Sequence, residues 1–118
     1  MTELITCLST GKGTWTHVLK LINSHDWENI FLITNEFGKQ TFKPNEKTKF
    51  VIINENDNIN SMINQIKEKI SKEVIGPQVA FNMMSGSGKE HMAALSAILK
   101  MGLAVRLVYM KNNEMLEL

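Results

Sequence analysis

Two turns rich in glycine, serine and threonine carry the residues best suited to bind an anion. The first, Ser9 to Thr14, follows a short apolar run and contains Gly11, Lys12 and Gly13. The second, Ser85 to Lys89, follows another apolar run and leads into a helix-forming segment. Backbone N–H groups and the positive end of a helix dipole meet at such a turn, which suits a phosphate. We therefore predict one phosphate site built from both turns.

The candidate ligand-contacting residues all lie in or beside these two turns. Lys12 and Lys89 can neutralise phosphates, and the turns can offer backbone N–H groups. Ser87 has an alternative structural role, because Glu90 three residues later matches a helix capping box. The full set of candidates comprises Ser9, Thr10, Gly11, Lys12, Gly13, His17, Asn82, Ser85, Gly86, Ser87, Gly88, Lys89 and His91.

The common phosphate-binding motifs do not fit these turns. A P-loop requires a glycine six residues before its lysine and a hydroxyl residue after it, whereas Lys89 has Met83 and Glu90 there. The dinucleotide fingerprint fails because Thr16 stands where the third glycine belongs. The three histidines are scattered without metal-ligand spacing, so no metal centre or cofactor is predicted.

Composition points to one ordinary globular domain over residues 1–118. Hydrophobic residues make up 43% and charged residues 21%, which is enough apolar material for one modest core. A net charge of +1 gives no reason to expect binding to duplex DNA or to an anionic membrane. The lone cysteine, Cys7, lies in an apolar run, so we expect a buried thiol and a cytoplasmic location.

The elements that must position the two turns follow from the hydrophobic pattern. Continuous apolar runs predict strands at 4–8, 30–34, 50–53, 79–83 and 103–110, with a short sixth at 115–118. Helical spacing predicts one helix from Trp15 to Ser24 and another from Gly88 to about Lys100. Between them, a further helix is predicted to begin after an N-cap at Asp57 and to end before Gly76-Pro77. Residues 35–48 fit at most a short helix followed by a loop.

This order predicts an α/β fold: a Rossmann-like, mostly parallel sheet of about six strands, with helices on both faces and a C-terminal β-hairpin. The last helix should face the core with Met92, Leu95, Ile98 and Leu99. The usual strand order places the first strand beside the fourth. Both candidate turns then lie at the edge where open α/β sheets bind ligands.

Three stretches resemble the CARF domains, the CRISPR-associated Rossmann-fold sensors. FNMMSGSGKEHMAAL is similar to the family's segment of strand, Asn, small-Gly-x-x-Lys and Met/Ala helix. The strand and turn of residues 4–14 resemble its first motif, and AVRLVYM followed by MLEL resembles its closing hairpin. The Ser85–Gly88 sequence and the short 35–48 connection depart from the commoner pattern of the family.

The resemblance implies a homodimer that binds cyclic oligoadenylate, expected to be cyclic tetra-adenylate, across its two-fold axis. Because the chain ends after the hairpin, we expect a stand-alone domain, which in this family resembles a ring nuclease that ends type III CRISPR signalling in antiviral defence. Such an enzyme is metal-independent and leaves a 2′,3′-cyclic phosphate. The resemblance places the catalytic roles on Lys89 and on Ser9 or Thr10.

Two alternatives stay open from the sequence. The chain could bind the cyclic oligonucleotide without cleaving it, as a sensor or sink that acts through a partner. It could also be an unrelated small Rossmann-like domain that binds another phosphorylated ligand.

Overall fold

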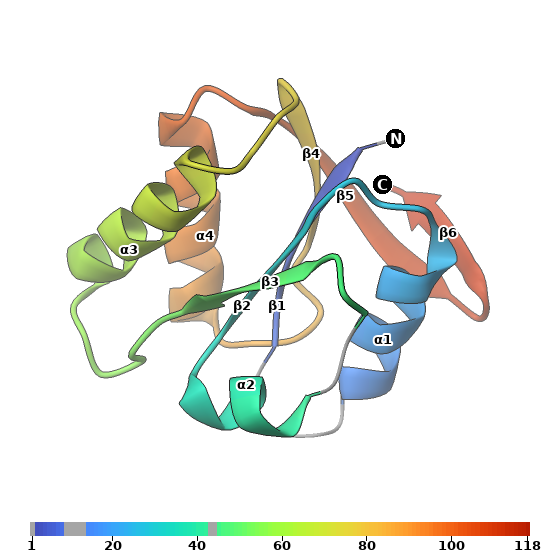
Figure 1. Cartoon of the computed structure of the whole chain (residues 1–118), viewed down its shortest axis with the longest axis horizontal. Helices are drawn as coiled ribbons and strands as arrows, with labels where there is room; N and C mark the ends of the chain where they lie inside the picture. The colour runs from blue at the N-terminus through green and yellow to red at the C-terminus, as the bar shows by residue number, and fades with distance from the viewer. Residues whose placement is uncertain (1, 9–13, 43–44) are drawn as a thin grey trace.

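The computed structural model describes residues 2–8, 14–42 and 45–118 of the chain. Strands and helices alternate along it and form one six-stranded sheet with flanking helices (Figure 1). The strands are β1 (Glu3–Cys7), β2 (Ile30–Thr34), β3 (Thr48–Ile52), β4 (Gln78–Asn82), β5 (Ala104–Lys111) and β6 (Glu114–Glu117). The helices are α1 (Trp15–Ser24), α2 (Glu36–Thr41), α3 (Ile59–Ser71) and α4 (Gly88–Lys100).

The sheet has the strand order β3-β2-β1-β4-β5-β6. Strands β1 to β5 pair in parallel, and β6 pairs with β5 in the antiparallel direction. The hairpin between β5 and β6 turns at Asn112, whose φ of 58° is the left-handed value that asparagine tolerates. The predicted α/β class, the pairing of β1 with β4 and the C-terminal hairpin are therefore confirmed.

Helices cover both faces of the sheet, because the side chains of β1 alternate between two apolar clusters. Ile5 and Cys7 pack in the cluster that contains the buried residues of α3 and α4. Leu4 and Leu8 pack in the cluster that contains the buried residues of α1. Figure 1 shows α3 and α4 together on one side of the sheet and α1 on the other. The helices that follow β1 and β4, α1 and α4, therefore lie on opposite faces of the sheet.

The predicted core face of α4 is partly wrong. Ile98 is fully buried, but Met92 and Leu99 are 64% and 62% exposed. Three of the buried positions are small, namely Ala93, Ala94 and Ala97, and the others are Ile98 and Glu90. Small side chains let α4 approach α3 closely, which leaves the large apolar residues on the outer face.

The start of α3 differs by one residue from the prediction. The N-cap is Asn58, whose side-chain oxygen accepts a hydrogen bond from Ser61 N at 2.8 Å. Asp57, the expected cap, instead accepts from the Gln65 side chain at 2.9 Å. The helix ends at Ser71, ahead of Gly76-Pro77. The predicted short helix within residues 35–48 is confirmed as α2.

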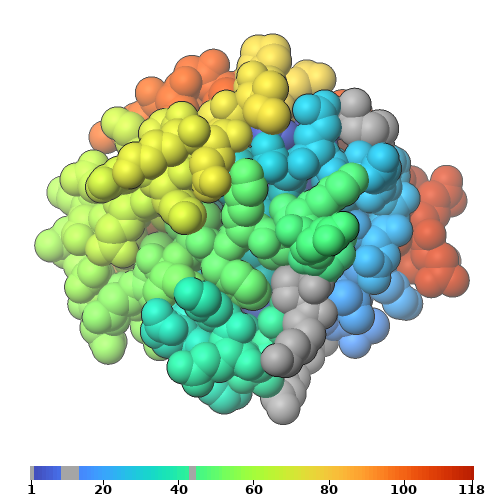
Figure 2. Space-filling view, in the orientation of Figure 1, coloured from blue at the N-terminus to red at the C-terminus, as the bar shows by residue number. Residues whose placement is uncertain are grey.

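Strand β3 forms one edge of the sheet and lies at the surface of the face drawn in Figure 2, next to α2 and α3. The amino edge of the sheet is fixed by Glu3, whose carboxylate is 2% exposed. It accepts hydrogen bonds from the backbone N–H groups of Ile75 and Gly76 and from the Asn29 side chain. A buried carboxylate with this many donors stabilises the fold, whereas ligands of open α/β sheets bind at the opposite, carboxyl edge.

Candidate functional site

The candidate site lies where the strand order reverses, between the carboxyl ends of β1 and β4. Thr6 of β1 stands opposite Asn82 of β4 in the sheet. From this point the chain leaves toward α1 on one face and α4 on the other. The candidates Ser9, Thr10, Gly11, Lys12 and Gly13 fall outside the described residues. The geometry below therefore concerns the second turn and the starts of the two helices.

Asn82 joins both sides of this switch point. Its side chain is 2% exposed. The amide nitrogen donates to Val108 O at 2.8 Å and lies 3.2 Å from His17 Nε2. The amide oxygen accepts from Met84 N at 3.2 Å and lies 3.4 Å from the Thr6 hydroxyl. Every polar atom of this side chain is thus engaged within the protein, which makes Asn82 a residue that positions the turn.

His17, in the first turn of α1, is held as a neutral imidazole. Its Nε2 faces two donors, the Asn82 amide and, at 3.4 Å, the backbone N–H of Met110. An atom that faces two donors acts as the acceptor, so the ring proton belongs on Nδ1. Burial lowers the pKa of His17, and the neighbouring positive charge of Lys20 lowers it further. His17 therefore links α1 to β4 and β5 in its uncharged form.

The turn after β4 is tightly built around Gly86. This residue has a φ of 101°, and a Cβ placed there would lie 3.1 Å from Cys7 Cβ and 3.0 Å from Glu90 Oε1. Ser85, 1% exposed, presents its backbone carbonyl to His91 Nε2 at 2.8 Å. Because a carbonyl oxygen only accepts, His91 carries its proton on Nε2. The turn and the first turn of α4 thus hold one another in place.

Ser87 is the N-cap of α4, and the predicted capping box is confirmed. Glu90 N donates to Ser87 Oγ at 3.2 Å, and Ser87 N donates to Glu90 Oε1 at 2.7 Å. Glu90 is 8% exposed, so its carboxylate is part of the structure of this turn. Gly88, by contrast, has open space where a Cβ would stand.

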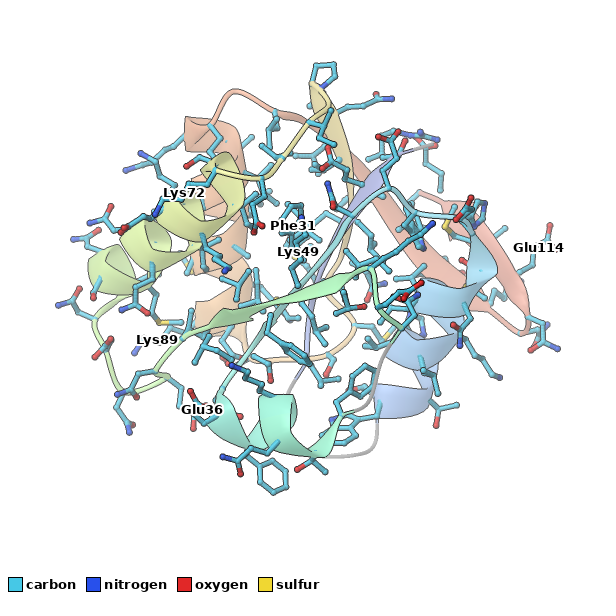
Figure 3. All side chains as sticks on the ribbon, viewed as in Figure 1. Phe31, Glu36, Lys49, Lys72, Lys89 and Glu114 are labelled. Carbon is cyan, nitrogen blue, oxygen red and sulfur yellow. The ribbon has the colours of Figure 1, made fainter. Side chains whose placement is uncertain are left out.

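Lys89 lies at the surface, and its ammonium group contacts a different loop. The Nζ atom donates to the backbone carbonyls of Glu55, at 3.0 Å, and Asp57, at 2.5 Å, both in the loop between β3 and α3. Figure 3 shows Lys89 beside that loop, at the edge of the molecule where Glu36 also lies. The side chain therefore bridges the start of α4 and the loop that precedes α3.

Cys7 and Trp15 have structural roles. Cys7 is 1% exposed, and burial together with the negative charge of Glu90 raises the pKa of its thiol, so it is no nucleophile. Trp15 packs edge-on against Phe42, with ring centroids 5.6 Å apart, and contributes to the core. Among the residues that the structure describes, no three His, Cys, Asp or Glu side chains group so that they could hold a metal ion.

Sequence reasoning missed several polar residues at the same edge of the sheet. Asn35 directly follows β2, and Asn54 comes two residues after β3. Together with Glu36, Glu55 and Gln65 they border a hollow next to the loop that Lys89 contacts. The signal in the sequence was an amide residue just after each apolar run, at the edge where ligands bind.

Comparison with models of known protein families gives no match, and no curated protein matches the chain. Within the described ranges, no helix has the length and apolar character needed to cross a membrane.

Proposed function

We propose that this protein binds cyclic oligoadenylate, expected to be cyclic tetra-adenylate, across the two-fold axis of a homodimer in the cytoplasm. We further propose that it cleaves the ring as a metal-independent ring nuclease and so ends type III CRISPR signalling. The family assignment behind this proposal rests on the sequence resemblance to CARF domains. The geometry contributes an independent argument for an anion site.

One observation carries the argument for that site. The N-termini of α1 and α4 approach the same switch point from opposite faces of the sheet, where His17 of α1 lies 3.2 Å from Asn82 at the end of β4. Two helix N-termini near one point favour negative charge there more strongly than one does. A second copy of the chain would add two more, which suits a ring of phosphates with two-fold symmetry.

The proposed reaction needs no added reactant, because the nucleophile is the ligand's own 2′-oxygen. The protein has to position that oxygen and stabilise the charge on the phosphoryl oxygens. The 2′-oxygen of one ribose attacks the adjacent phosphorus, and the bond from phosphorus to the 5′-oxygen breaks. The proton lost from the 2′-hydroxyl is balanced by the proton that the departing 5′-oxygen gains. The products are a 2′,3′-cyclic phosphate and a 5′-hydroxyl. Ser9 or Thr10 and Lys89 would stabilise the extra charge on the phosphoryl oxygens.

Exposed apolar side chains support the homodimer. Met92 and Leu99 are seven residues apart on the outer face of α4 and are 64% and 62% exposed. Near the end of β4, Met84 and Leu107 are also exposed and border an apolar hollow of about 370 Å³. Large apolar side chains that gather at a surface are typical of interfaces between protein chains.

A second candidate function, binding without cleavage, is favoured by the contacts of Lys89. Its ammonium group donates to the carbonyls of Glu55 and Asp57. It must leave these two oxygens before it can contact a phosphate. If it stays, the turn offers backbone donors for binding but no cation for catalysis. The protein would then act as a sensor or sink.

The test is incubation of the protein with labelled cyclic tetra-adenylate in EDTA. We expect linear products that end in a 2′,3′-cyclic phosphate. Lys89→Ala should slow the reaction about 100-fold or more, as the loss of one oxyanion donor does. Lys100→Ala, which removes an exposed lysine at the far end of the same helix, is the matched control and should cleave at the normal rate.

The other outcomes separate the alternatives. Tight binding without turnover supports the sensor or sink and contradicts the nuclease. Absence of binding at micromolar protein contradicts both and leaves the unrelated Rossmann-like domain with another phosphorylated ligand. A rate that falls in Lys89→Ala while the dissociation constant stays constant places Lys89 in the chemical step.

A further inference from the structure

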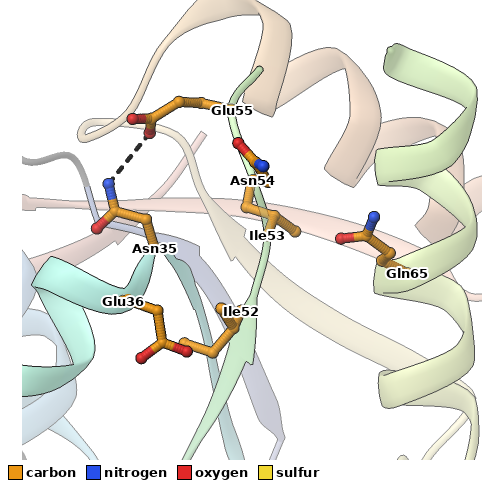
Figure 4. Close-up of a pocket in the computed structure, with 7 residues that line it drawn as sticks. All are labelled: Asn35, Glu36, Ile52, Ile53, Asn54, Glu55 and Gln65. Atoms are coloured by element: carbon orange, nitrogen blue, oxygen red, sulfur yellow. Dashed lines mark hydrogen bonds between the residues drawn. The ribbon is translucent and has the colours of Figure 1, made fainter. Parts of the chain in front are cut away.

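A second hollow opens at the carboxyl edge of the sheet, beyond β2 and β3. Its volume is about 380 Å³, within the range of small-molecule sites. Figure 4 shows it between the start of α2, the end of β3 and α3. The residues that line it are Asn35, Glu36, Ile52, Ile53, Asn54, Glu55 and Gln65.

The lining combines an apolar wall with a polar rim. Ile52 and Ile53 supply the apolar part, and Ile53 is 3% exposed, so that wall is anchored in the core. Amide and carboxylate side chains supply the rest. An apolar surface with a few fixed polar groups is the usual composition of a ligand site.

Internal hydrogen bonds fix the orientation of the amide groups. Asn54 Oδ1 accepts from Asn56 N at 3.0 Å, which leaves Asn54 Nδ2 as a donor. Gln65 Nε2 donates to Asp57 Oδ2 at 2.9 Å and to Ser61 Oγ at 3.1 Å, which leaves Gln65 Oε1 as an acceptor. Within the described part of the chain, neither Asn54 Nδ2 nor Gln65 Oε1 has a hydrogen-bond partner.

A free donor and a free acceptor on one rim match the edge of a nucleobase. Adenine presents an amino group beside a ring nitrogen, which asparagine and glutamine side chains bind well. The carboxylates of Glu36 and Glu55 are further acceptors. They favour a base with an amino group and repel one with a keto oxygen at that position. Asn35 Nδ2 donates to Glu55 Oε2 at 3.1 Å and so holds this carboxylate at the rim.

The hollow adjoins the candidate phosphate site. Lys89, two residues beyond the cap of α4, donates to the carbonyl of Glu55, which lines the hollow. The same short loop therefore borders both places. The ammonium group of Lys89, a candidate phosphate contact, therefore lies at the border of the hollow.

We propose that this hollow binds an adenine base of the ligand whose phosphates occupy the switch point, with Asn54 and Gln65 reading the amino edge of the base. This inference rests on the proposed function, because it takes the base from the proposed cyclic oligoadenylate. It assigns the specificity for adenine to residues that the phosphate site does not contain.

The decisive variant is Asn54→Asp, which keeps the oxygen that accepts from Asn56 N, replaces the donor Nδ2 with an oxygen and adds one negative charge. We expect its dissociation constant for cyclic tetra-adenylate to rise about tenfold or more. Asn64→Asp makes the same chemical change at an exposed position of α3 outside the hollow, and its affinity should stay unchanged. The wild type should bind cyclic tetra-inosinate, which carries keto groups, about tenfold or more weakly than the adenine ring.

A titration followed by ¹⁵N-resolved NMR shows whether the adenine pocket or the proposed function is wrong. Cyclic tetra-adenylate should shift the side-chain amide signals of Asn54 and Gln65. If the ring binds but these signals and the affinity of Asn54→Asp do not change, the base pocket is wrong and the proposed function stands. If the ring does not bind at all, the proposed function is wrong, and the pocket falls with it unless 5′-AMP shifts the same two signals.

Discussion

The hydrogen bonds of Asn82 give this residue a structural role at the candidate site. Its amide oxygen holds Met84 N and its amide nitrogen contacts Val108 O and His17, so it fixes where the β4 turn begins. Ser87 and Glu90 fix where α4 begins. The side chains that support the turn are therefore distinct from the exposed Lys89, whose ammonium group is available for exchange between partners.

The neutral His17 makes stability depend on pH. Burial and the charge of Lys20 lower the pKa of His17 in the folded protein. The unfolded chain, with an ordinary histidine pKa near about 6.5, binds more protons than the folded one below that pH. The contribution of His17 is therefore complete above about pH 6.5 and is lost as the pH falls through that value toward the folded pKa.

We predict that His17→Ala lowers the free energy of unfolding by about 1–3 kcal/mol at pH 8, because the Asn82 amide and Met110 N–H lose their acceptor. At pH 5.5 the difference from the wild type should be smaller. Urea denaturation at both pH values measures this. His25→Ala, at an exposed histidine, is the control. A His17 effect that is equal at both pH values would contradict the assignment of a neutral imidazole.

At the scale of the element, α4 combines a buried face with an N-terminus that lies at the candidate site. Its alanine face packs against α3, while its N-terminus faces the candidate phosphate site. The capping box determines where that N-terminus lies. The Ser87 side chain accepts from the N–H of Glu90, and the Glu90 side chain accepts from the N–H of Ser87. Stability and ligand binding should therefore respond differently to a change at the cap.

For Ser87→Ala we predict a loss of about 1 kcal/mol in the free energy of unfolding, the usual cost of a missing N-cap. Ser87→Thr keeps a capping hydroxyl and should lose less. The affinity for cyclic tetra-adenylate should change little in either variant. Urea denaturation and a binding titration on the same samples measure both quantities. Normal stability with lost binding in Ser87→Ala would instead make Ser87 a ligand residue.

The sequence predicts the elements of this fold well because its strands are short, continuous apolar runs bounded by polar turns. It fails on α4 for a physical reason. Hydrophobic spacing identifies an apolar face but not what covers it, so Met92 and Leu99 look like core while Ala93 and Ala97 fill that place. The cap of α3 was misassigned because Asp57 and Asn58 are both good caps, and Gln65 engages the first.

The sequence predicts which strands and helices carry the described candidate residues, but not what those residues contact. Parallel strand order places β1 beside β4 as predicted, and Lys89 lies at the start of α4 as predicted. No pattern in the chain indicates that its ammonium group contacts carbonyls 32 and 34 residues away. Asn35 and Asn54 were missed because an asparagine after a strand is also an ordinary cap or turn residue.

At the scale of the whole molecule, the exposed apolar residues remain to be explained. Met84, Met92, Leu99 and Leu118 are each more than 45% exposed, although a chain of this size has few apolar side chains to spare. Exposed methionines suit an interface, since their flexible side chains adapt to a partner surface. A second copy of the chain is the partner that the proposed two-fold ligand requires.

We predict that the wild type sediments at twice the chain mass of 13.4 kDa and that Met92→Glu combined with Leu99→Glu shifts it to a monomer. Burial of the Met92 or Leu99 side chain in the interface contributes about 1.5–3 kcal/mol to the free energy of dimer formation, and a carboxylate at either position reverses that gain. Lys100→Glu, a change of charge at an exposed position of the same helix, should stay dimeric.

The same double variant also tests whether the proposed site needs two copies of the chain. Each chain would still contribute the N-termini of its own α1 and α4, so weak binding of a single phosphate should persist. Binding of cyclic tetra-adenylate should fall far more steeply, because a ring that spans the two-fold axis gains its affinity from contacts with both chains at once. A monomer that binds the ring as tightly as the dimer would place the whole site within one chain and contradict the two-fold arrangement.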